Sequence, residues 1–308
     1  MVALTPMSSF SVSVVDTRRT TGSVLKFAIS YSTASLGVDA GHLVAFARHA
    51  EACGFEALYM PEHVVLHPGA MLGSMELPPD LPFVDPLDAL CFVAASTSRI
   101  LLGTGVLLVP YQHPVVLAKR LATVDVLSRG RMRLLTVGLG GLPGEAQALG
   151  VDFGSRGRRA DEAIDVLRLL WSGGAEGVGF HGEFFDFDAL CSFPKPYGVT
   201  TLPIHVGGSS RAAARRAGQR GDGYFPGGML SPQERAAQFE LARSAAVAAG
   251  RDPGALEQTR WASIALTRER AEALAVEGVT RVVVNVTSAD PAEQRDEMSA
   301  LAERFALI

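Results

Sequence analysis

Short β-rich segments alternate with helical segments along almost the whole chain, and this alternation constrains the fold most. We predict strands at Leu25–Tyr31, Glu56–Met60, Ile100–Thr104, Met132–Val137, Pro203–Val206, Gly223–Phe225, Arg260–Leu266 and Arg281–Val286. We predict helices at Ala40–Cys53, Pro86–Ser96, Pro114–Leu127, Arg158–Trp171, Ser210–Gln219, Pro232–Ala249, Arg268–Glu277 and Pro291–Phe305. Eight strands, each followed by a helix, are typical of the α/β class and of its (β/α)8 TIM barrel. An open doubly wound sheet is the alternative, but no GxGxxG follows the first strand.

Two insertions interrupt the alternation. The first, Pro61 to Asp85, follows the second strand and is rich in Pro, Gly and Leu. The second, Gly173 to Thr201, follows the fourth helix and carries alternating aromatic residues. Long excursions from a compact barrel are commonly lids or binding loops. We expect the first to overhang the carboxyl ends of the strands, and the second either to stay at the opposite face or to climb the outside as a small hairpin.

Composition favours a single folded domain over residues 23–308. The net charge of -4 and the lack of a Lys/Arg cluster argue against a nucleic-acid partner. Residues 1–22 have no apolar core, so we interpret them as a loose extension or an early start codon, with no signal peptide or membrane span. Three scattered cysteines without CxxC spacing suit a cytoplasmic protein and predict no metal site. The alanine-rich, lysine-poor composition is typical of a high-GC genome such as an actinobacterium's.

Two glycines stand near the end of the third strand, in the run ILLGTGVLLVP from Ile100 to Pro110. Glycine weakens a strand, so Gly103 and Gly105 indicate a bulge or a close approach of the backbone to another group. Ligands of α/β proteins bind at this end of the strands. The run therefore indicates either a flat ligand resting on a distorted strand or a tight strand exit without a ligand.

The second strand ends in Glu62 and His63, which places an acid and an imidazole where barrel enzymes build their catalytic sites. Histidine titrates near neutral pH and can give or take a proton as a substrate gains or loses a hydride. A surface pair at the start of a loop is the alternative. His67, in the same loop, is a weaker candidate, and we expect His113 to serve the start of the third helix.

Two further strand exits are rich in glycine. The fourth strand runs into Gly138, Leu139 and Gly140, where bare backbone leaves room for a ring or a tail to cross the barrel mouth. The fifth strand runs into Gly207-Gly208-Ser209-Ser210 before an alanine-rich helix. Free amides at a helix start, two hydroxyls and the helix dipole make a phosphate cradle, although Ser210 is equally suited to be only an N-cap.

In their order and spacing, five stretches of the chain resemble the luciferase-like monooxygenase superfamily, and more narrowly its actinobacterial branch that uses the deazaflavin coenzyme F420. They are GFEALYMPEHVV (54–65), RILLGTGVLLVP (99–110), LATVDVLSRGRMRL (121–134), VGLGG with the following GEAQALGV (137–151) and PIHVGGSSRAAARRAGQRGDGYFP (203–226). The resemblance runs from about residue 26 to 307. It implies a bacterial-luciferase-like barrel, commonly a homodimer, with the cofactor at the carboxyl ends of the strands.

The resemblance also implies roles for single residues. Glu62 falls at a cofactor contact and His63 at a proposed proton donor, and we take both as catalytic candidates. Gly105 and Val106 fall where such enzymes often carry a non-proline cis peptide that buttresses the ring. The remaining cofactor-binding positions implied are Thr104, Gly138, Leu139, Gly140, Gly207, Gly208, Ser209, Ser210 and Arg211.

The chain departs from the sugar-phosphate dehydrogenases of the superfamily in two ways. Gly141 occupies the place of their carboxylate proton acceptor, Glu145 belongs to a different position, and their phosphate-binding lysine has no secure counterpart. We therefore reject a sugar phosphate and predict hydride transfer between F420 and an unidentified small organic substrate, with His63 as acid or base. An FMN-dependent luciferase-like monooxygenase is one alternative, and a non-catalytic flavin-binding paralogue is another.

Overall fold

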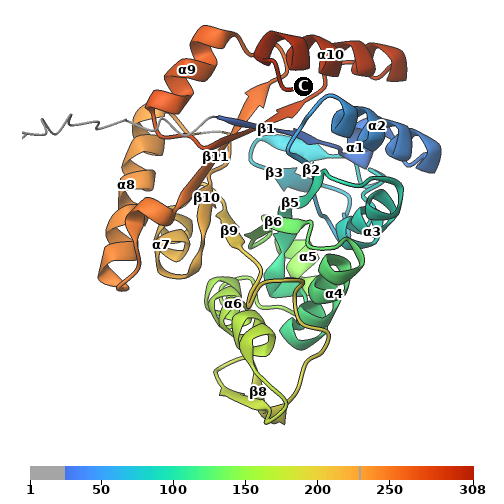
Figure 1. Ribbon diagram of the computed structural model, residues 1–308. Coiled ribbons are helices and arrows are strands. Elements are labelled where there is room, and N and C mark those ends of the chain that lie inside the picture. The colour runs from blue at the N-terminus through green and yellow to red at the C-terminus, as the bar shows by residue number, and fades with distance from the viewer. Residues whose placement is uncertain (1–24, 229) are drawn as a thin grey trace, which may run out of the picture.

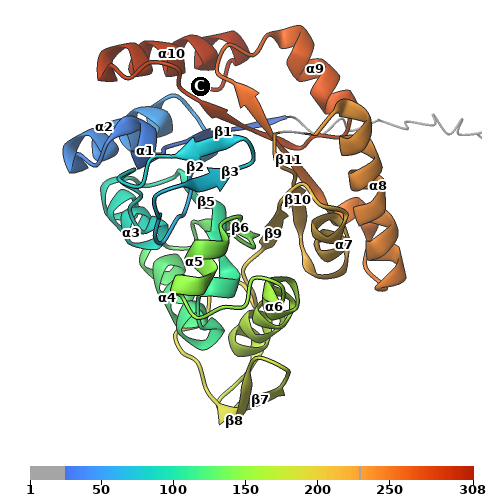
Figure 2. The ribbon, with the colours of Figure 1, turned by 180° about the vertical axis from the view of Figure 1, so that it is seen from behind.

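Eight parallel strands close into a barrel, and helices surround it (Figures 1 and 2). The coordinates are a computed structural model that describes residues 25–228 and 230–308, so the predicted extension 1–22 lies outside the described residues. Around the barrel the strand order is β1-β12-β11-β10-β9-β6-β5-β2. The strands are β1 Lys26–Ser30, β2 Ala57–Met60, β5 Leu101–Leu108, β6 Met132–Gly138, β9 Ile204–Gly207, β10 Gly223–Phe225, β11 Glu257–Ser263 and β12 Arg281–Asn285. The predicted (β/α)8 TIM barrel is therefore confirmed.

The outer helices begin where the sequence supplies a cap. Asp85, Ser231 and Asp290 each accept a hydrogen bond from a backbone N–H of the first helical turn, and a proline follows each of them. His113 caps its helix in the same way, as predicted. The helices are α2 Ala40–Ala52, α3 Pro86–Ser96, α4 Pro114–Leu127, α6 Arg156–Ser172, α7 Arg211–Arg220, α8 Pro232–Ala248, α9 Arg268–Val276 and α10 Pro291–Phe305.

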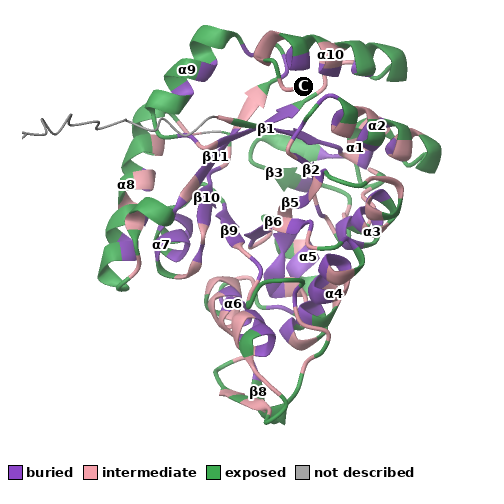
Figure 3. Ribbon diagram, in the orientation of Figure 1, coloured by how far each residue is buried: buried purple, intermediate pink, exposed green. Residues whose placement is uncertain are grey.

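The barrel strands are mostly buried, whereas the helices are buried along their inner faces (Figure 3). Inside the barrel, Tyr59 packs edge-on against Phe225, which in turn contacts Trp261. At the amino ends of the strands the buried Arg281 guanidinium binds the carboxylates of Glu56 and Glu257. Aromatic rings and this ion cluster therefore fill the barrel, and ligands are left to its carboxyl end.

Two of the predicted strands had wrong boundaries. β11 begins three residues earlier than predicted and ends at Ser263, because a turn follows in which Leu266 N–H donates to the Ser263 carbonyl at 3.0 Å. β5 continues past its glycines to Leu108 instead of ending at Thr104, because a bulge at Val106 absorbs the irregularity and pairing with β6 resumes at Leu107.

Both insertions form antiparallel hairpins. In the first, β3 (Ala70–Leu72) pairs with β4 (Met75–Leu77) beside the carboxyl ends of the strands. In the second, β7 (Val178–His181) pairs with β8 (Asp186–Leu190), and the backbone N–H groups of residues 183–185 donate to the Glu162 carboxylate of α6. Because Glu162 lies near the start of α6, the second insertion climbs the outside of the barrel as the predicted small hairpin.

Short elements complete the chain. The helices α1 (Thr33–Leu36) and α5 (Pro143–Ala148) and the 3-10 turns η1 (Val109–Tyr111) and η2 (Pro253–Ala255) lie in loops and were not predicted. In the part of the chain that the structure describes, no helix is long and apolar enough to cross a membrane.

Candidate active site

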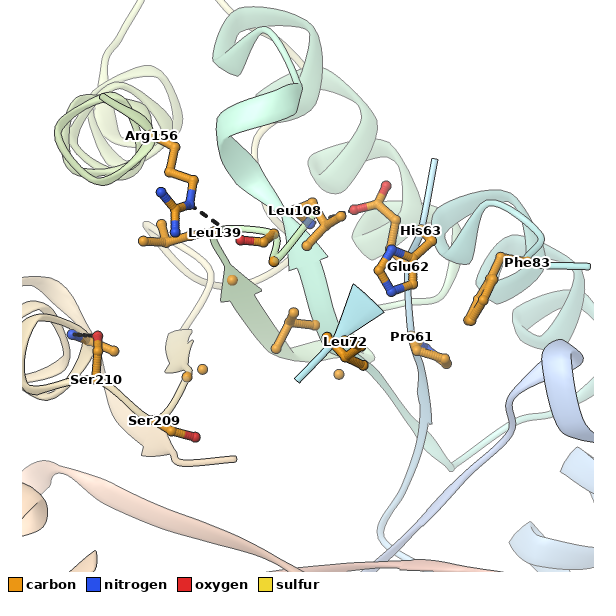
Figure 4. Close-up of a pocket in the computed structure, with 18 of the residues that line it drawn as sticks. Pro61, Glu62, His63, Leu72, Phe83, Leu108, Leu139, Arg156, Ser209 and Ser210 are labelled. Atoms are coloured by element: carbon orange, nitrogen blue, oxygen red, sulfur yellow. Dashed lines mark hydrogen bonds between the residues drawn. The ribbon is translucent and has the colours of Figure 1, made fainter. Parts of the chain in front are cut away.

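A cavity of about 540 Å³ opens at the carboxyl ends of β2, β5, β6 and β9 (Figure 4). Its size is that of a small-molecule or cofactor site. The predicted residues that line it are Glu62, His63, Gly105, Val106, Gly138, Leu139, Gly140, Gly207, Gly208, Ser209 and Ser210. In Figure 4, Glu62, His63 and Phe83 lie on one side and Arg156, Ser209 and Ser210 on the other. We call these the histidine end and the serine end.

The floor between the two ends is built around Val106. The Gly105–Val106 peptide bond is cis, as predicted, and Val106 is the residue left unpaired between β5 and β6. A Cβ atom added at Gly207 would lie 2.5 Å from Val106 Cγ1, and one added at Gly138 would overlap Val106 Cγ2. The expectation that glycine at the β6 exit leaves this space to a ring was therefore wrong for Gly138, because the Val106 side chain fills it.

Glu62 is held inside the wall of the histidine end. Only 6% of the residue is exposed. One carboxylate oxygen accepts the Leu108 N–H, and the other accepts Gln112 Nε2 at 3.0 Å. Burial raises the pKa of Glu62 to about 7, and the nearby Asp85 and Glu145 carboxylates act in the same direction, whereas the Leu108 and Gln112 hydrogen bonds oppose it. Both oxygens are thus engaged in fixing the exit of β5.

His63 reaches the cavity with one ring nitrogen already bound. Its Nδ1 lies 3.2 Å from Glu145 Oε2, and its ring packs edge-on against Phe83. The other Glu145 oxygen accepts the Val64 N–H at 2.7 Å, and Glu145 is fully buried. In this network Nδ1 donates to Glu145, and no described residue binds Nε2. Nε2 is the atom left for a ligand.

The serine end presents backbone donors at the start of α7. The Ser210 hydroxyl accepts the Ala213 N–H at 3.0 Å, so Ser210 is the helix N-cap. Behind the loop, Tyr224 donates to the Gly208 carbonyl at 2.9 Å and Gln238 to the Ser209 carbonyl at 2.6 Å. Among the described residues, the N–H groups of Ser209 and Ser210 have no acceptor. This end can hold an anion.

Arg156 adds a positive charge to the same end. Its Nε donates to the Gly140 carbonyl at 3.3 Å, another nitrogen donates to the Phe153 carbonyl, and its guanidinium lies over the Phe153 ring. Within residues 25–228 and 230–308, no carboxylate forms an ion pair with it. A guanidinium held by carbonyls and a ring beside open N–H groups is well placed for a phosphate or carboxylate.

Two predicted cofactor residues do not line the cavity. Thr104 is buried, and its hydroxyl bridges β5 to β6 by donating to the Thr136 carbonyl and accepting the Thr136 N–H. Arg211 is exposed at the start of α7 and is not among the residues that line the cavity. The weaker candidate His67 also lies outside the lining residues, where its Nδ1 contacts the Pro68 carbonyl.

Sequence reasoning assigned no site role to Arg156, Leu72 or Phe83, and it named Glu145 without its contact to His63. Glu145 and Arg156 each lie at the start of a helix that follows the exit of β6, and this shared position was the available signal. Leu72 and Phe83 belong to the first insertion: Phe83 packs against His63, and Leu72 lines the cavity beside Gly141, but no periodic pattern points to them. The described residues contain no group of three His, Cys, Asp or Glu side chains placed to hold a metal ion.

The model of the luciferase-like monooxygenase family matches residues 8–306. The chain belongs to this family. An uncharacterised protein of Mycobacterium tuberculosis (strain ATCC 25618 / H37Rv) is 31% identical over 205 residues, which is 64% of this chain and 69% of that protein.

Two relatives with named activities are matched over a smaller share of their own length than the mycobacterial protein. The F420-dependent glucose-6-phosphate dehydrogenase of Microbacterium testaceum (strain StLB037) is 30% identical over 207 residues, 65% of this chain and 56% of that enzyme. The FMNH(2)-dependent dimethylsulfone monooxygenase of Pseudomonas fluorescens (strain Pf0-1) is 39% identical over 137 residues, 44% of this chain and 36% of that enzyme. The family therefore includes relatives of both cofactor types.

The fold has a close match among solved structures. The monooxygenase RslO1 from Streptomyces bottropensis superposes with a TM-score of 0.72 at 23% identity, covering 91% of this chain and 98% of that one. At this identity the likeness concerns the fold alone.

Proposed function

We propose that the chain is an F420-dependent oxidoreductase that transfers a hydride between the deazaflavin and a small organic substrate. One observation carries the proposal: the oriented imidazole of His63 lines the same cavity as the open backbone donors of Ser209 and Ser210. Such a cavity can hold a long anionic cofactor at one end and a reacting group at the other.

The serine end fits the anionic part of this cofactor. F420 carries a phosphate, and the N–H groups of Ser209 and Ser210 together with the Arg156 guanidinium are donors suited to it. When bound, F420 supplies the hydride donor or acceptor, and the protein supplies placement and a dry pocket. Gly208 lines the cavity beside these donors with φ +115°, a backbone conformation that glycine adopts readily and other residues rarely do.

His63 is the residue we assign to proton transfer. Glu145 accepts the Nδ1 proton, so the neutral imidazole has its lone pair at Nε2, and the protonated ring has an N–H there. A substrate that gains or loses a hydride at carbon exchanges a proton at a neighbouring atom, which Nε2 can give or take. Glu145 is then a positioning residue, as is Glu62, which fixes the β5 exit beside Val106.

Parallel fluorescence titrations with F420 and FMN test the cofactor assignment. We expect tighter binding of F420, since the F420-dependent relative matches 65% of this chain and the serine end offers donors for an anionic tail. Micromolar binding of FMN without binding of F420 would contradict the proposal. It would favour the FMN-dependent monooxygenase, for which the FMNH(2)-dependent relative is the supporting observation.

The homodimer and the cytoplasmic location stay predictions. The predicted homodimer has twice the chain mass of 32.5 kDa, which light scattering after size-exclusion chromatography measures directly.

The non-catalytic flavin-binding paralogue has its own test. A chain that binds F420 but turns over none of a broad panel of alcohols and carbonyl compounds would support it.

A further inference from the structure

We propose that the histidine end of the cavity selects small, uncharged, apolar substrates and that Leu72 is the residue that makes this selection. The inference rests on the proposed function in one respect, namely that a cofactor fills the serine end. The observations that carry it are the register of the β3–β4 hairpin, the position of Leu72 over the space beside Gly141, and the charges around the histidine end.

The hairpin register sets Leu72 on its inner face. Ala70 pairs with Leu77, Met71 with Glu76 and Leu72 with Met75. Because side chains alternate along a strand, Ala70 and Leu72 share one face and Met71 lies on the other. Ala70 and Leu77 are buried in a small apolar cluster with Leu142, a residue just beyond the exit of β6. The hairpin is thus anchored to the rim of the barrel, and Leu72 lines the cavity.

Leu72 meets the rim at Gly141. A Cβ atom added to Gly141 would lie 3.4 Å from Leu72 Cδ1, so the leucine side chain covers the space next to this glycine. Pro61, Phe83 and Leu108 complete the apolar wall of this end. A substrate held here shares the cavity of about 540 Å³ with the cofactor, and this favours a small substrate.

Charges at the histidine end disfavour an ionic substrate. The acidic groups next to His63 are Glu145, which is fully buried, and Glu62, which is 6% exposed. Arg156 is the cation lining the cavity, and it lies across the cavity beside Gly140 (Figure 4). An anion would be repelled by the Glu145 carboxylate, and above about pH 7 by the ionised Glu62 as well. A cation would lose its hydration against Leu72 and Phe83, because both Glu145 oxygens are already engaged.

Three matched ketones test the inference on the intact chain: acetophenone, anionic 4-acetylbenzoate and cationic 4-acetyl-N,N,N-trimethylanilinium. Their dissociation constants are measured by competition in saturation-transfer NMR, with saturating F420 and without it. We expect acetophenone to bind at least about tenfold more tightly than either charged ketone. Equal or tighter binding of a charged ketone overturns the proposal.

The hairpin supplies its own control. Leu72 and Met71 are 45% and 48% exposed, yet only Leu72 lines the cavity. We expect Leu72→Asp to weaken acetophenone binding about tenfold and Met71→Asp to change it less than about twofold. Leu72→Ala, which removes apolar contact without adding a charge, should also weaken acetophenone binding. Equal effects of the Leu72 and Met71 variants overturn the proposal, and thermal unfolding of each variant shows whether it is folded.

The same samples separate this inference from the proposed function. A chain that binds acetophenone in a Leu72-dependent way but does not bind F420 refutes the proposed function and supports the apolar site. A chain that binds F420 but shows no preference for acetophenone refutes the apolar site alone.

Discussion

The two ends of the cavity are built in different ways. The serine end comes mainly from one contiguous segment, Gly207 to Ala213, whose backbone donors follow directly from a strand that runs into a helix. The histidine end is assembled from side chains far apart in the chain: Glu62 binds Leu108 and Gln112, and His63 binds Glu145. An anion cradle can therefore be local, whereas an oriented proton-transfer group needs partners from several elements.

The difference also appears in charge. Two buried carboxyl groups, Glu62 and Glu145, stand at the histidine end, and the Arg156 guanidinium stands at the serine end. An anionic cofactor is thus directed to one end and the reacting group to the other. Substitutions at the histidine end should change turnover, and substitutions at the serine end should change cofactor binding.

The largest effect is expected for His63→Ala. Turnover should fall by ~100-fold or more while the dissociation constant of F420 changes much less, because the imidazole transfers a proton. Steady-state kinetics and fluorescence titration measure the two quantities. His67→Ala, in the same loop but outside the cavity lining, is the control. Equal losses in binding and turnover would show that His63 only holds the cofactor.

A smaller loss, about tenfold in kcat, is expected for Glu145→Gln. The amide oxygen can still accept the Val64 N–H, but the other end of the amide no longer favours a proton on His63 Nδ1. The 15N chemical shifts of the His63 ring should report an Nδ1–H tautomer in the parent chain and a mixture in the variant. Glu162→Gln is the matched control, since Glu162 also accepts backbone N–H groups but lies on α6 beside the second hairpin. Unchanged ring shifts would contradict a positioning role.

The contrast between local and long-range contacts also explains which parts of the structure the sequence predicts. The eight strands and the Ser210 cap depend on short-range patterns, so they could be predicted, and the cis bond at Gly105–Val106 followed from the family resemblance. The contact of His63 with Glu145 spans 82 residues, and no local pattern specifies it. Thr104 lies outside the cavity lining because its hydroxyl is bound to Thr136, and this pairing depends on the register between two strands.

At the serine end, Arg156→Met should weaken F420 binding about tenfold and leave kcat at saturating F420 unchanged. The methionine keeps much of the side-chain volume over Phe153 but removes the charge. Arg158→Met is the control, because Arg158 pairs with Glu183 on the exposed surface. If the dissociation constant for F420 is the same in parent and variant, Arg156 does not contact the cofactor's anionic part.

The smallest expected effect is on the stability of the protein, and it concerns Glu62 at the histidine end. Burial raises the pKa of Glu62 from 4.5 to about 7 in the folded chain, so between these values the folded state binds more protons than the unfolded state. The free energy of unfolding therefore falls as pH rises through this window. The Glu62 share of that fall is about 1 kcal/mol between about pH 6 and 8.

In Glu62→Gln the amide does not titrate, so the stability of this variant should fall less steeply over this range than that of the parent. Urea unfolding at several pH values measures the difference between the two curves, with Glu76→Gln on the exposed face of the hairpin as the control. Parallel curves for parent and Glu62→Gln would show that Glu62 titrates outside this window, and burial would then not be what sets its charge.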